Sequence, residues 1–239
     1  MTKVNAVEVN MTSQVSRKPS NSEILITLVL DETGSMNSCW DSTISSVNDY
    51  MGSQKSAPGV AKASLYKFSS SGWGASLAEP VRTVFENKLV AEVEELSRAN
   101  YVPNGGTNLY DAIGMTIRKI ESQLAPLNEV PDVLMVIVTD GGENTSREYN
   151  LDAVKKLVQA KEAEGWTFIY LGANQDAWSV GQSFGLSKGQ TMTYDTAAMN
   201  STMGTLASAT TAYRGLRTSG QVAYGSTTKN FFGDGKEKS

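Results

Sequence analysis

Histidine is missing from this sequence of 239 residues, and there is a single cysteine, Cys39. Without histidine, the chain can form neither a Ser-His-Asp or Cys-His nucleophile pair nor a histidine-based zinc site. One cysteine excludes an intramolecular disulfide. Because no histidine can activate it, we interpret Cys39 as a small apolar helix residue rather than a nucleophile.

Long apolar runs and an excess of basic charge are missing as well. No window reaches the roughly 18 apolar residues of a membrane helix, and the first residues lack the apolar core of a signal peptide. The formal net charge is −4, so no basic field attracts nucleic acid. We therefore expect a cytoplasmic protein that binds neither membranes nor nucleic acid.

Several stretches have the composition or alternation of β-strands. Residues 24–30 and 133–138 are unbroken apolar runs, which are typical of parallel strands buried on both faces. Residues 81–85 alternate apolar and polar side chains after Pro80, as an edge strand does. The other predicted strands are residues 60–68, 167–171 and 190–194.

Helical segments separate these strands along most of the chain. The predicted helices are residues 38–54, 89–98, 107–124, 151–164, 175–184 and 197–216. Such alternation is typical of a doubly wound, mostly parallel α/β sheet with helices on both faces. Residues 1–22 are expected to form a polar N-terminal arm, and residues 217–239, rich in Gly, Ser and Lys, a flexible C-terminal tail.

Two of the apolar strands end directly in an aspartate, Asp31 and Asp140. The carboxyl ends of the strands in a doubly wound sheet share one edge, and ligands bind there. If the two strands are neighbours, two carboxylates meet in one crevice, and their repulsion calls for a cation between them. No Lys or Arg lies within five residues of Asp31, or between Asp132 and Glu143 around Asp140. The missing positive charge is therefore predicted to be a metal ion.

Hydroxyl groups complete the predicted ligand set. Asp31, Thr33 and Ser35 alternate along one loop, and Thr107 follows a Gly-Gly pair that allows close backbone approach. A set made of oxygen donors favours Mg²⁺ or Mn²⁺, with Ca²⁺ less favoured because few carboxylates are available. Taken singly, each segment is more typical of a helix cap or a turn. Their joint occurrence, in order and at strand ends, favours the metal site.

The three segments together resemble a known family. Residues 31–36 (DETGSM) resemble the Asp-x-Ser-x-Ser motif of the von Willebrand factor type A fold, which integrin inserted domains share, and residues 105–112 and 138–143 resemble its second and third segments. The resemblance covers about residues 23–216. It implies a Rossmann-like sheet of order 3-2-1-4-5-6 with an antiparallel third strand, and a metal-ion-dependent adhesion site. Residues 166–177 (WTFIYLGANQDA) are similar to stretches in stand-alone bacterial and phage members of the family. Thr33 stands in place of the first serine of the motif.

The resemblance implies that the serine and threonine hydroxyls bind the metal directly, while the aspartates often act through water. Mostly neutral ligands leave the cation under-neutralised, so an aspartate or glutamate of a partner protein can complete its coordination. The resulting hypothesis is a non-enzymatic binding module. Asn37, Trp73 and Tyr101 belong to loops on the ligand edge and are candidate contacts with the partner, although packing beneath its loop suits Tyr101 better.

Two other functions remain open at this point. A metal-dependent hydrolase or phosphotransferase would need a general base, for which Glu32 or Glu143 is the candidate. A structural subunit of a larger assembly would use the metal only to stabilise its loops. Glu143 and Asp111 could also support the metal ligands, although capping or surface roles suit each of them equally.

Overall fold

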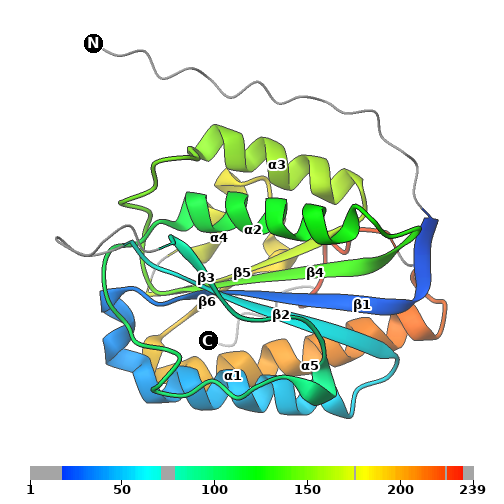
Figure 1. Ribbon diagram of the computed structural model, residues 1–239, viewed down its shortest axis with the longest axis horizontal. Coiled ribbons are helices and arrows are strands. Elements are labelled where there is room, and N and C mark those ends of the chain that lie inside the picture. Colours follow the sequence, from blue (N-terminus) through cyan, green and yellow to red (C-terminus); the bar gives the residue numbers. More distant parts are fainter. Residues whose placement is uncertain (1–17, 71–78, 175, 224, 234–239) are drawn as a thin grey trace.

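The computed structural model describes residues 18–70, 79–174, 176–223 and 225–233 (Figure 1). Within them, the strands form one six-stranded sheet of order β3-β2-β1-β4-β5-β6. The strands are β1 (Lys18–Asp31), β2 (Val60–Phe68), β3 (Val81–Leu89), β4 (Glu129–Thr139), β5 (Thr167–Ala173) and β6 (Thr191–Tyr194). Only β3 pairs antiparallel to its neighbour, β2. The predicted α/β sheet is therefore confirmed, including its strand order.

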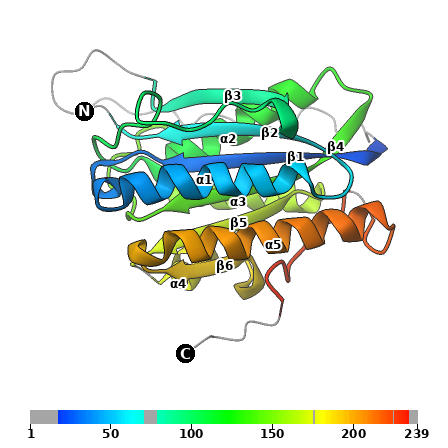
Figure 2. The ribbon, with the colours of Figure 1, turned by 90° about the horizontal axis from the view of Figure 1, so that it is seen from below.

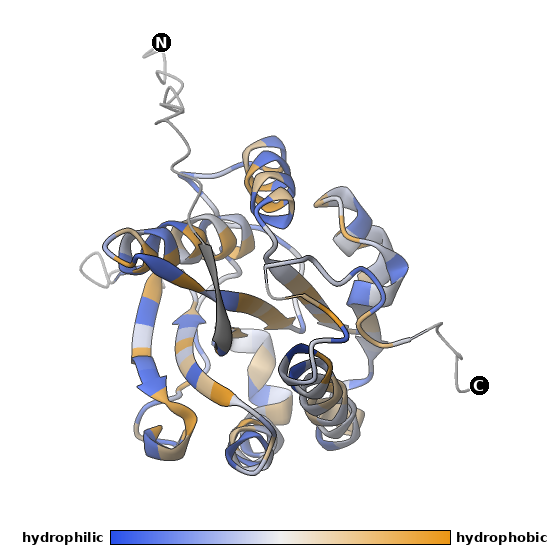
Figure 3. Ribbon diagram, turned by 90° about the vertical axis from the view of Figure 1, so that its right-hand side faces the viewer, coloured by the Kyte–Doolittle hydropathy of each residue, from blue (hydrophilic) through white to orange (hydrophobic). Residues whose placement is uncertain are grey.

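Helices cover both faces of the sheet (Figures 1 and 2). They are α1 (Trp40–Lys55), α2 (Leu109–Leu124), α3 (Leu151–Ala163), α4 (Ala177–Ser183) and α5 (Met199–Thr218), with short 3-10 turns that include η1 (Gly34–Cys39) and η4 (Thr196–Ala198). One face packs against α1 and α5, and the other against α2, α3 and α4. Figure 3 shows hydrophilic residues on the outward sides of the helices, as expected for a sandwich with the sheet inside.

The central strands divide their apolar side chains between the two faces. In β1, Leu28 and Leu30 contact the α1/α5 layer, whereas Val29 contacts the α2/α3/α4 layer. All three side chains are completely buried. This period of two explains why an unbroken apolar run forms a central parallel strand.

The sheet changes its winding direction between β1 and β4. The chain leaves β1 toward α1 on one face and leaves β4 toward α3 on the other. The two strands pair in parallel up to Leu30 opposite Val138, so Asp31 lies beside Thr139 and one residue before the level of Asp140. Ligands of doubly wound folds bind in the crevice at such a switch point.

The predicted helix at residues 89–98 is wrong. Apart from a 3-10 turn at Val90–Glu92, these residues form an irregular connection. The side chain of Asn48 on α1 accepts a hydrogen bond from Leu96 N (2.8 Å) and donates one to Leu96 O (2.9 Å). Backbone groups that a helix would use are therefore satisfied by a residue far away in the sequence.

The boundaries predicted for both ends also need correction. Strand β1 begins at Lys18, inside the predicted polar arm, and Lys18 pairs with Glu129. At the other end, α5 continues to Thr218, and Phe231, in the described part of the chain after it, packs into the core where a flexible tail was predicted. The aromatic ring of Phe231 is almost buried against Tyr213. Arg217, which forms a buried ion pair with Asp132, also contacts Ser226, and Phe231 packs on Tyr213. The composition of this segment did not indicate these contacts.

None of the helices in the described part of the chain has both the length and the apolar character needed to cross a bilayer.

Candidate metal centre

The first carboxylate lies at the end of β1. Asp31 is completely buried, and its two oxygens accept hydrogen bonds from Thr33 N (2.7 Å) and from the Thr139 hydroxyl (2.5 Å). Tyr101 donates its hydroxyl proton to the Asp31 backbone carbonyl at 2.8 Å. These contacts fix both the side chain and the backbone of Asp31 at the switch point.

The second carboxylate, Asp140, is joined to the loop after β1 by a chain of hydroxyl groups. Ser35 Oγ donates to Asp140 Oδ1 at 2.5 Å. Thr33 Oγ1 and Ser35 Oγ share a hydrogen bond of 3.1 Å. The hydroxyls of Thr33 and Ser35 therefore lie together beside Asp140.

Thr107 comes from the connection before α2. Its backbone N–H donates to the Asn144 side chain, and its carbonyl accepts from Asn144 N, both at 2.9 Å. A Cβ atom on Gly141 would lie 2.8 Å from Thr107 Oγ1 and 3.7 Å from Ser35 Oγ. The Thr107 and Ser35 hydroxyls therefore both lie close to Gly141, next to Asp140.

A glycine earlier in the same connection allows the loops to approach each other. Gly105 has a φ of +80°, and a Cβ there would lie 1.8 Å from the Ser70 carbonyl oxygen. The Gly105 carbonyl accepts from Gly34 N at 3.0 Å. This contact docks the Thr107 segment onto the loop after β1, which is the role predicted for the Gly-Gly pair.

Electrostatics at this point disfavours two free carboxylates. Burial raises the pKa of Asp31 to about 6, the hydrogen bonds from Thr139 and Thr33 oppose this shift, and the charge of Asp140 adds to it. Burial also raises the pKa of Asp140. Among the described residues, neither carboxylate forms an ion pair with Lys or Arg. A dication between the two would favour the ionised form of both.

The donor set suits a hard cation with few carboxylates. Within the described ranges, no cluster of three or more His, Cys, Asp or Glu side chains could hold a metal. The convergent oxygens here are two carboxylates and three hydroxyls. Such a set fits Mg²⁺ or Mn²⁺, which accept mixed oxygen ligands and retain water, better than Ca²⁺, which takes six to eight oxygens.

The acids near the site that the sequence left undecided have capping roles. Asp111, on α2, is buried and accepts hydrogen bonds from the backbone N–H groups of Arg147, Glu148 and Tyr149 at 2.8–2.9 Å. Glu143 accepts from Tyr110 N at 2.9 Å and from the backbone and hydroxyl of Ser146. Both acids therefore order the loop that follows Asp140.

Glu32 has a larger role than the sequence suggested. Its side chain is buried, and its carboxylate pairs with Lys67 (2.8 Å) and Arg82 (2.5 Å) and accepts from Val102 N (2.6 Å). Sequence reasoning missed this cluster because the two cations come from β2 and β3, far from Glu32 along the chain. A polar residue directly after a buried strand was the only available signal.

The three candidate partner contacts have different outcomes. Asn37 is exposed and donates to the Gly34 carbonyl at 2.8 Å, so its position is compatible with the prediction. Tyr101 is completely buried beneath its loop, so it cannot contact a partner and that prediction is wrong. Its ring is needed under the loop, where its hydroxyl holds Asp31. Trp73 lies outside the described residues.

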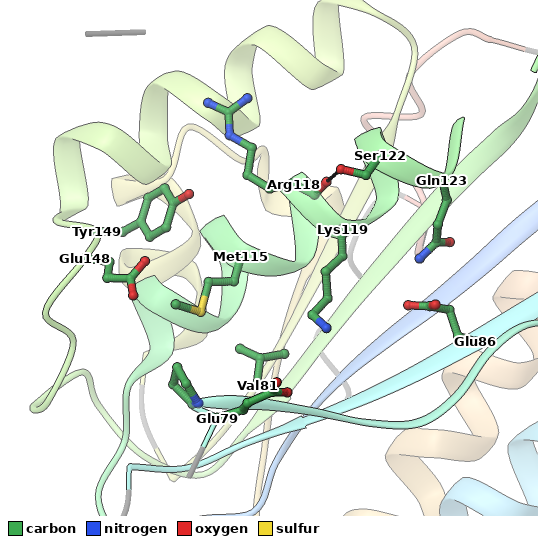
Figure 4. A pocket seen from close by; sticks show the side chains of 11 residues that line it. Glu79, Val81, Glu86, Met115, Arg118, Lys119, Ser122, Gln123, Glu148 and Tyr149 are labelled. Atoms are coloured by element: carbon green, nitrogen blue, oxygen red, sulfur yellow. Dashed lines mark hydrogen bonds between the residues drawn. The ribbon is translucent and has the colours of Figure 1, made fainter. Parts of the chain in front are cut away.

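A separate open groove of about 700 Å³ lies between α2 and β3 (Figure 4). Met115, Tyr149 and Val81 form its apolar part, and Arg118, Lys119 and Glu148 contribute charges of both signs. None of the predicted metal ligands lines this groove. The arrangement around Asp31 and Asp140 is therefore the better candidate for a specific site.

The sequence matches the family profile of the von Willebrand factor type A domain over residues 26–209. This chain belongs to that family. Domains of the family often mediate protein interactions and metal-dependent binding, and they are generally not enzymes. The matched range contains all the predicted ligands and ends inside α5. A comparison with curated proteins gave no match.

Solved structures share the fold at low sequence identity. Pilus adhesin SpaC from Lactobacillus rhamnosus GG is 15% identical, with a TM-score of 0.58 over 82% of this chain and 31% of that chain. Proximal thread matrix protein 1 from the mussel byssus is 14% identical (TM-score 0.52; 80% and 46%). The manganese-loaded TRAP protein of Plasmodium vivax is 12% identical (TM-score 0.50; 76% and 72%). The chain spans less than half the length of the first two.

Proposed function

We propose that this domain is a metal-dependent protein-interaction module. Asp31, Thr33, Ser35, Thr107 and Asp140 would hold one Mg²⁺ or Mn²⁺, and an aspartate or glutamate of a partner protein would complete the coordination. The convergence of these oxygens at the β1/β4 switch point carries the proposal. When bound, the cation supplies the positive charge that the two aspartates lack.

Burial differs across the ligand set and indicates where the partner would bind. Asp31, Thr33 and Thr107 are buried, whereas Ser35 is exposed and Asp140 is half-buried. An ion held by all five would therefore have its open side near Ser35 and Asp140. The hydroxyl ligands carry no charge, and the aspartates are expected to act through water. A carboxylate arriving on that side would therefore meet a cation that is not neutralised by its directly bound ligands, and would bind by a charge-assisted contact.

The exposed residues on the loops around the open side of the site favour a partner carboxylate that has uncharged neighbours in its own chain. Asn37, Asn104 and Asn144 are exposed on the loops that carry the ligands, and Val102 is an exposed apolar residue beside them. Amides can donate and accept hydrogen bonds but do not favour either sign of charge. We therefore expect a partner segment in which a single acid is flanked by polar uncharged or small apolar residues.

Hydrolysis is not supported as an activity. Glu32 is occupied by two cations and a backbone amide, and Glu143 by two backbone amides and a hydroxyl. A general base must be able to reach a water or substrate beside the metal. Neither glutamate is available for that role, so the proposal is for binding without catalysis. A cytoplasmic location is part of the same proposal.

A capture experiment separates this proposal from the structural-subunit hypothesis. The full chain would be immobilised and exposed to a library of peptides with one central Asp or Glu, in Mg²⁺ or in chelator. We expect capture in Mg²⁺ and loss of capture in chelator, with unchanged circular dichroism. Asp140→Ala should abolish capture, while Asp49→Ala, which removes an exposed carboxylate on α1, should leave it unchanged. Equal capture with and without the metal would refute the proposal.

A further inference from the structure

The loop after β1 carries a buried charge cluster directly beside the metal ligands. Glu32 follows Asp31 in the sequence, and 3% of its side chain is exposed. Lys67 and Arg82 face each other across the β2–β3 ladder. Two like charges in opposite positions of a sheet destabilise it unless something compensates them. Glu32 binds both and is thus their shared counterion.

Glu32 also joins the segments that supply the metal ligands. Its side chain accepts from Val102 N at 2.6 Å, and its backbone carbonyl accepts from Asn104 N at 2.8 Å. Its own N–H donates to the Phe68 carbonyl at 2.8 Å, and Lys67 reaches the Asn100 carbonyl. The chain that leads to Thr107 is therefore held against the chain that carries Asp31, Thr33 and Ser35 by contacts centred on Glu32.

The charges of the cluster do not cancel. Lys67 and Arg82 contribute two positive charges and Glu32 one negative charge, so the cluster has a formal charge of +1. Loss of the Glu32 charge would leave +2 close to the proposed site of a dication. Interactions between charges in a partly buried region are screened less than at the surface.

We infer that Glu32 is a positioning residue for the metal centre, which aligns the Thr107 segment with the loop after β1 and offsets two cations that would repel the metal. This inference rests on the proposed function, because it concerns the affinity of the same site. The competing explanation is that Glu32 only stabilises the fold. The two differ in whether metal affinity follows the charge of the cluster.

The test is calorimetric titration of the full chain with Mn²⁺ alone. Glu32→Gln keeps an oxygen that can accept from Val102 N but removes the charge. We expect Mn²⁺ affinity to fall about 10- to 100-fold, the usual loss when a group supporting metal ligands is changed. The matched control is Glu94→Gln, which removes the acid of the exposed Lys88–Glu94 pair and should leave affinity within about twofold of the wild type.

A second variant restores the charge. Combining Glu32→Gln with Arg82→Gln gives a cluster of one cation and no acid, and its formal charge returns to +1. We expect this double variant to recover most of the lost affinity. Arg82→Gln alone lowers the charge to zero and should bind Mn²⁺ at least as tightly as the wild type. If Glu32→Gln does not fold, the result for Arg82→Gln decides, and weaker binding there overturns the inference.

Asp140→Ala distinguishes the possible failures. If it loses Mn²⁺ binding while Glu32→Gln keeps wild-type affinity, the inference about Glu32 is overturned and the metal centre stands. Loss of affinity in Glu32→Gln without recovery in the double variant also overturns it, because charge would not be the cause. Wild-type affinity in Asp140→Ala would overturn both the metal centre and the inference.

Discussion

The aspartates at the two ends of the central strands differ in what compensates their negative charge. At the carboxyl edge, Asp31 and Asp140 meet with hydroxyl groups and no ion-pair partner among the described residues. Toward the amino edge, Asp132 on β4 is also buried, but Arg217 of α5 pairs with it at 2.8 Å and Tyr213 donates a hydrogen bond to it. One end contains its counterion, whereas the other has none among the described residues.

This difference separates a structural acid from a functional one. Taking a carboxylate out of water is costly unless a charge or donors compensate it. At Asp132 the compensation belongs to the fold and cannot be exchanged. At Asp31 and Asp140 it is incomplete, and in the proposed function a dissolved cation and a partner complete it. The four predictions that follow test this contrast.

The largest effect is expected at the amino edge. Arg217→Ala leaves Asp132 buried without its cation, and removing one partner of a buried ion pair costs about 3–5 kcal/mol of unfolding free energy. Urea denaturation should detect this loss, with or without Mg²⁺. The double variant Asp132→Asn/Arg217→Met should recover part of it. If Arg217→Ala were as stable as the wild type, the Asp132–Arg217 pair would not be what compensates the buried charge of Asp132.

The same kind of change at the carboxyl edge should have the opposite effect on the metal-free protein. Asp140→Asn removes a charge that raises the pKa of Asp31, so repulsion disappears. In chelator, its thermal midpoint should equal or exceed that of the wild type. Adding Mg²⁺ should stabilise only the wild type, by about 2.7 kcal/mol at 100 times the dissociation constant. A lower midpoint of the variant in chelator would contradict this account.

The pH dependence of the metal-free protein should be smaller but measurable. Burial raises the pKa of Asp31 to about 6 from an ordinary value of 3.8. The folded state therefore binds the proton more tightly than the unfolded state, and this contribution to stability is complete below pH 3.8 and is lost as pH rises through 6. A difference of one in pKa between the folded and unfolded states corresponds to about 1.4 kcal/mol. Urea titrations in chelator should show the decline relative to Asp31→Asn, and saturating Mg²⁺ should weaken it.

The smallest effect is expected at an exposed ion pair. Asp41 and Arg98 form a bidentate contact, but 73% and 60% of their side chains are exposed. Exposed pairs contribute little to stability because water screens them. Asp41→Asn should therefore match the wild type in both thermal midpoint and Mn²⁺ affinity. A clear loss in either measurement would show that exposure does not decide which acids matter here.

The sequence predicted the sheet and the proposed ligands because both depend on local patterns. Each apolar run that leads to Asp31 or Asp140 predicts, within one short segment, a strand, the position where it ends at the carboxyl edge of the sheet, and the ligand at that position. The alternation of Thr33 and Ser35 gives the direction of their hydroxyls in the same way. Parallel pairing of β1 with β4 was a non-local assumption, and the full strand order was implied by the resemblance to the family. The structure confirms both.

Features that depend on distant partners could not be predicted. The Asn48 side chain replaces a helix at residues 89–98, and Lys67 and Arg82 converge on Glu32 only after β2 and β3 have paired. The position of Tyr101 in a loop left both exposure and packing beneath the loop open, and its partner, the backbone carbonyl of Asp31, lies 70 residues away in the sequence. In each case a side chain from another element supplies the partner, and no local pattern contains that information.

The contacts that Arg217 and Asp132 form with residues after α5 affect how the domain can be shortened. Arg217 contacts Ala223 and Ser226, and Gly225 N donates to Asp132 at 2.9 Å. Stopping the chain at residue 216, where composition suggested that the domain ends, would remove the cation and uncover the ring of Tyr213. A truncated protein made for crystallisation or display would then aggregate through the exposed ring. One that extends to residue 233 would keep Arg217 on Asp132 and Phe231 on Tyr213.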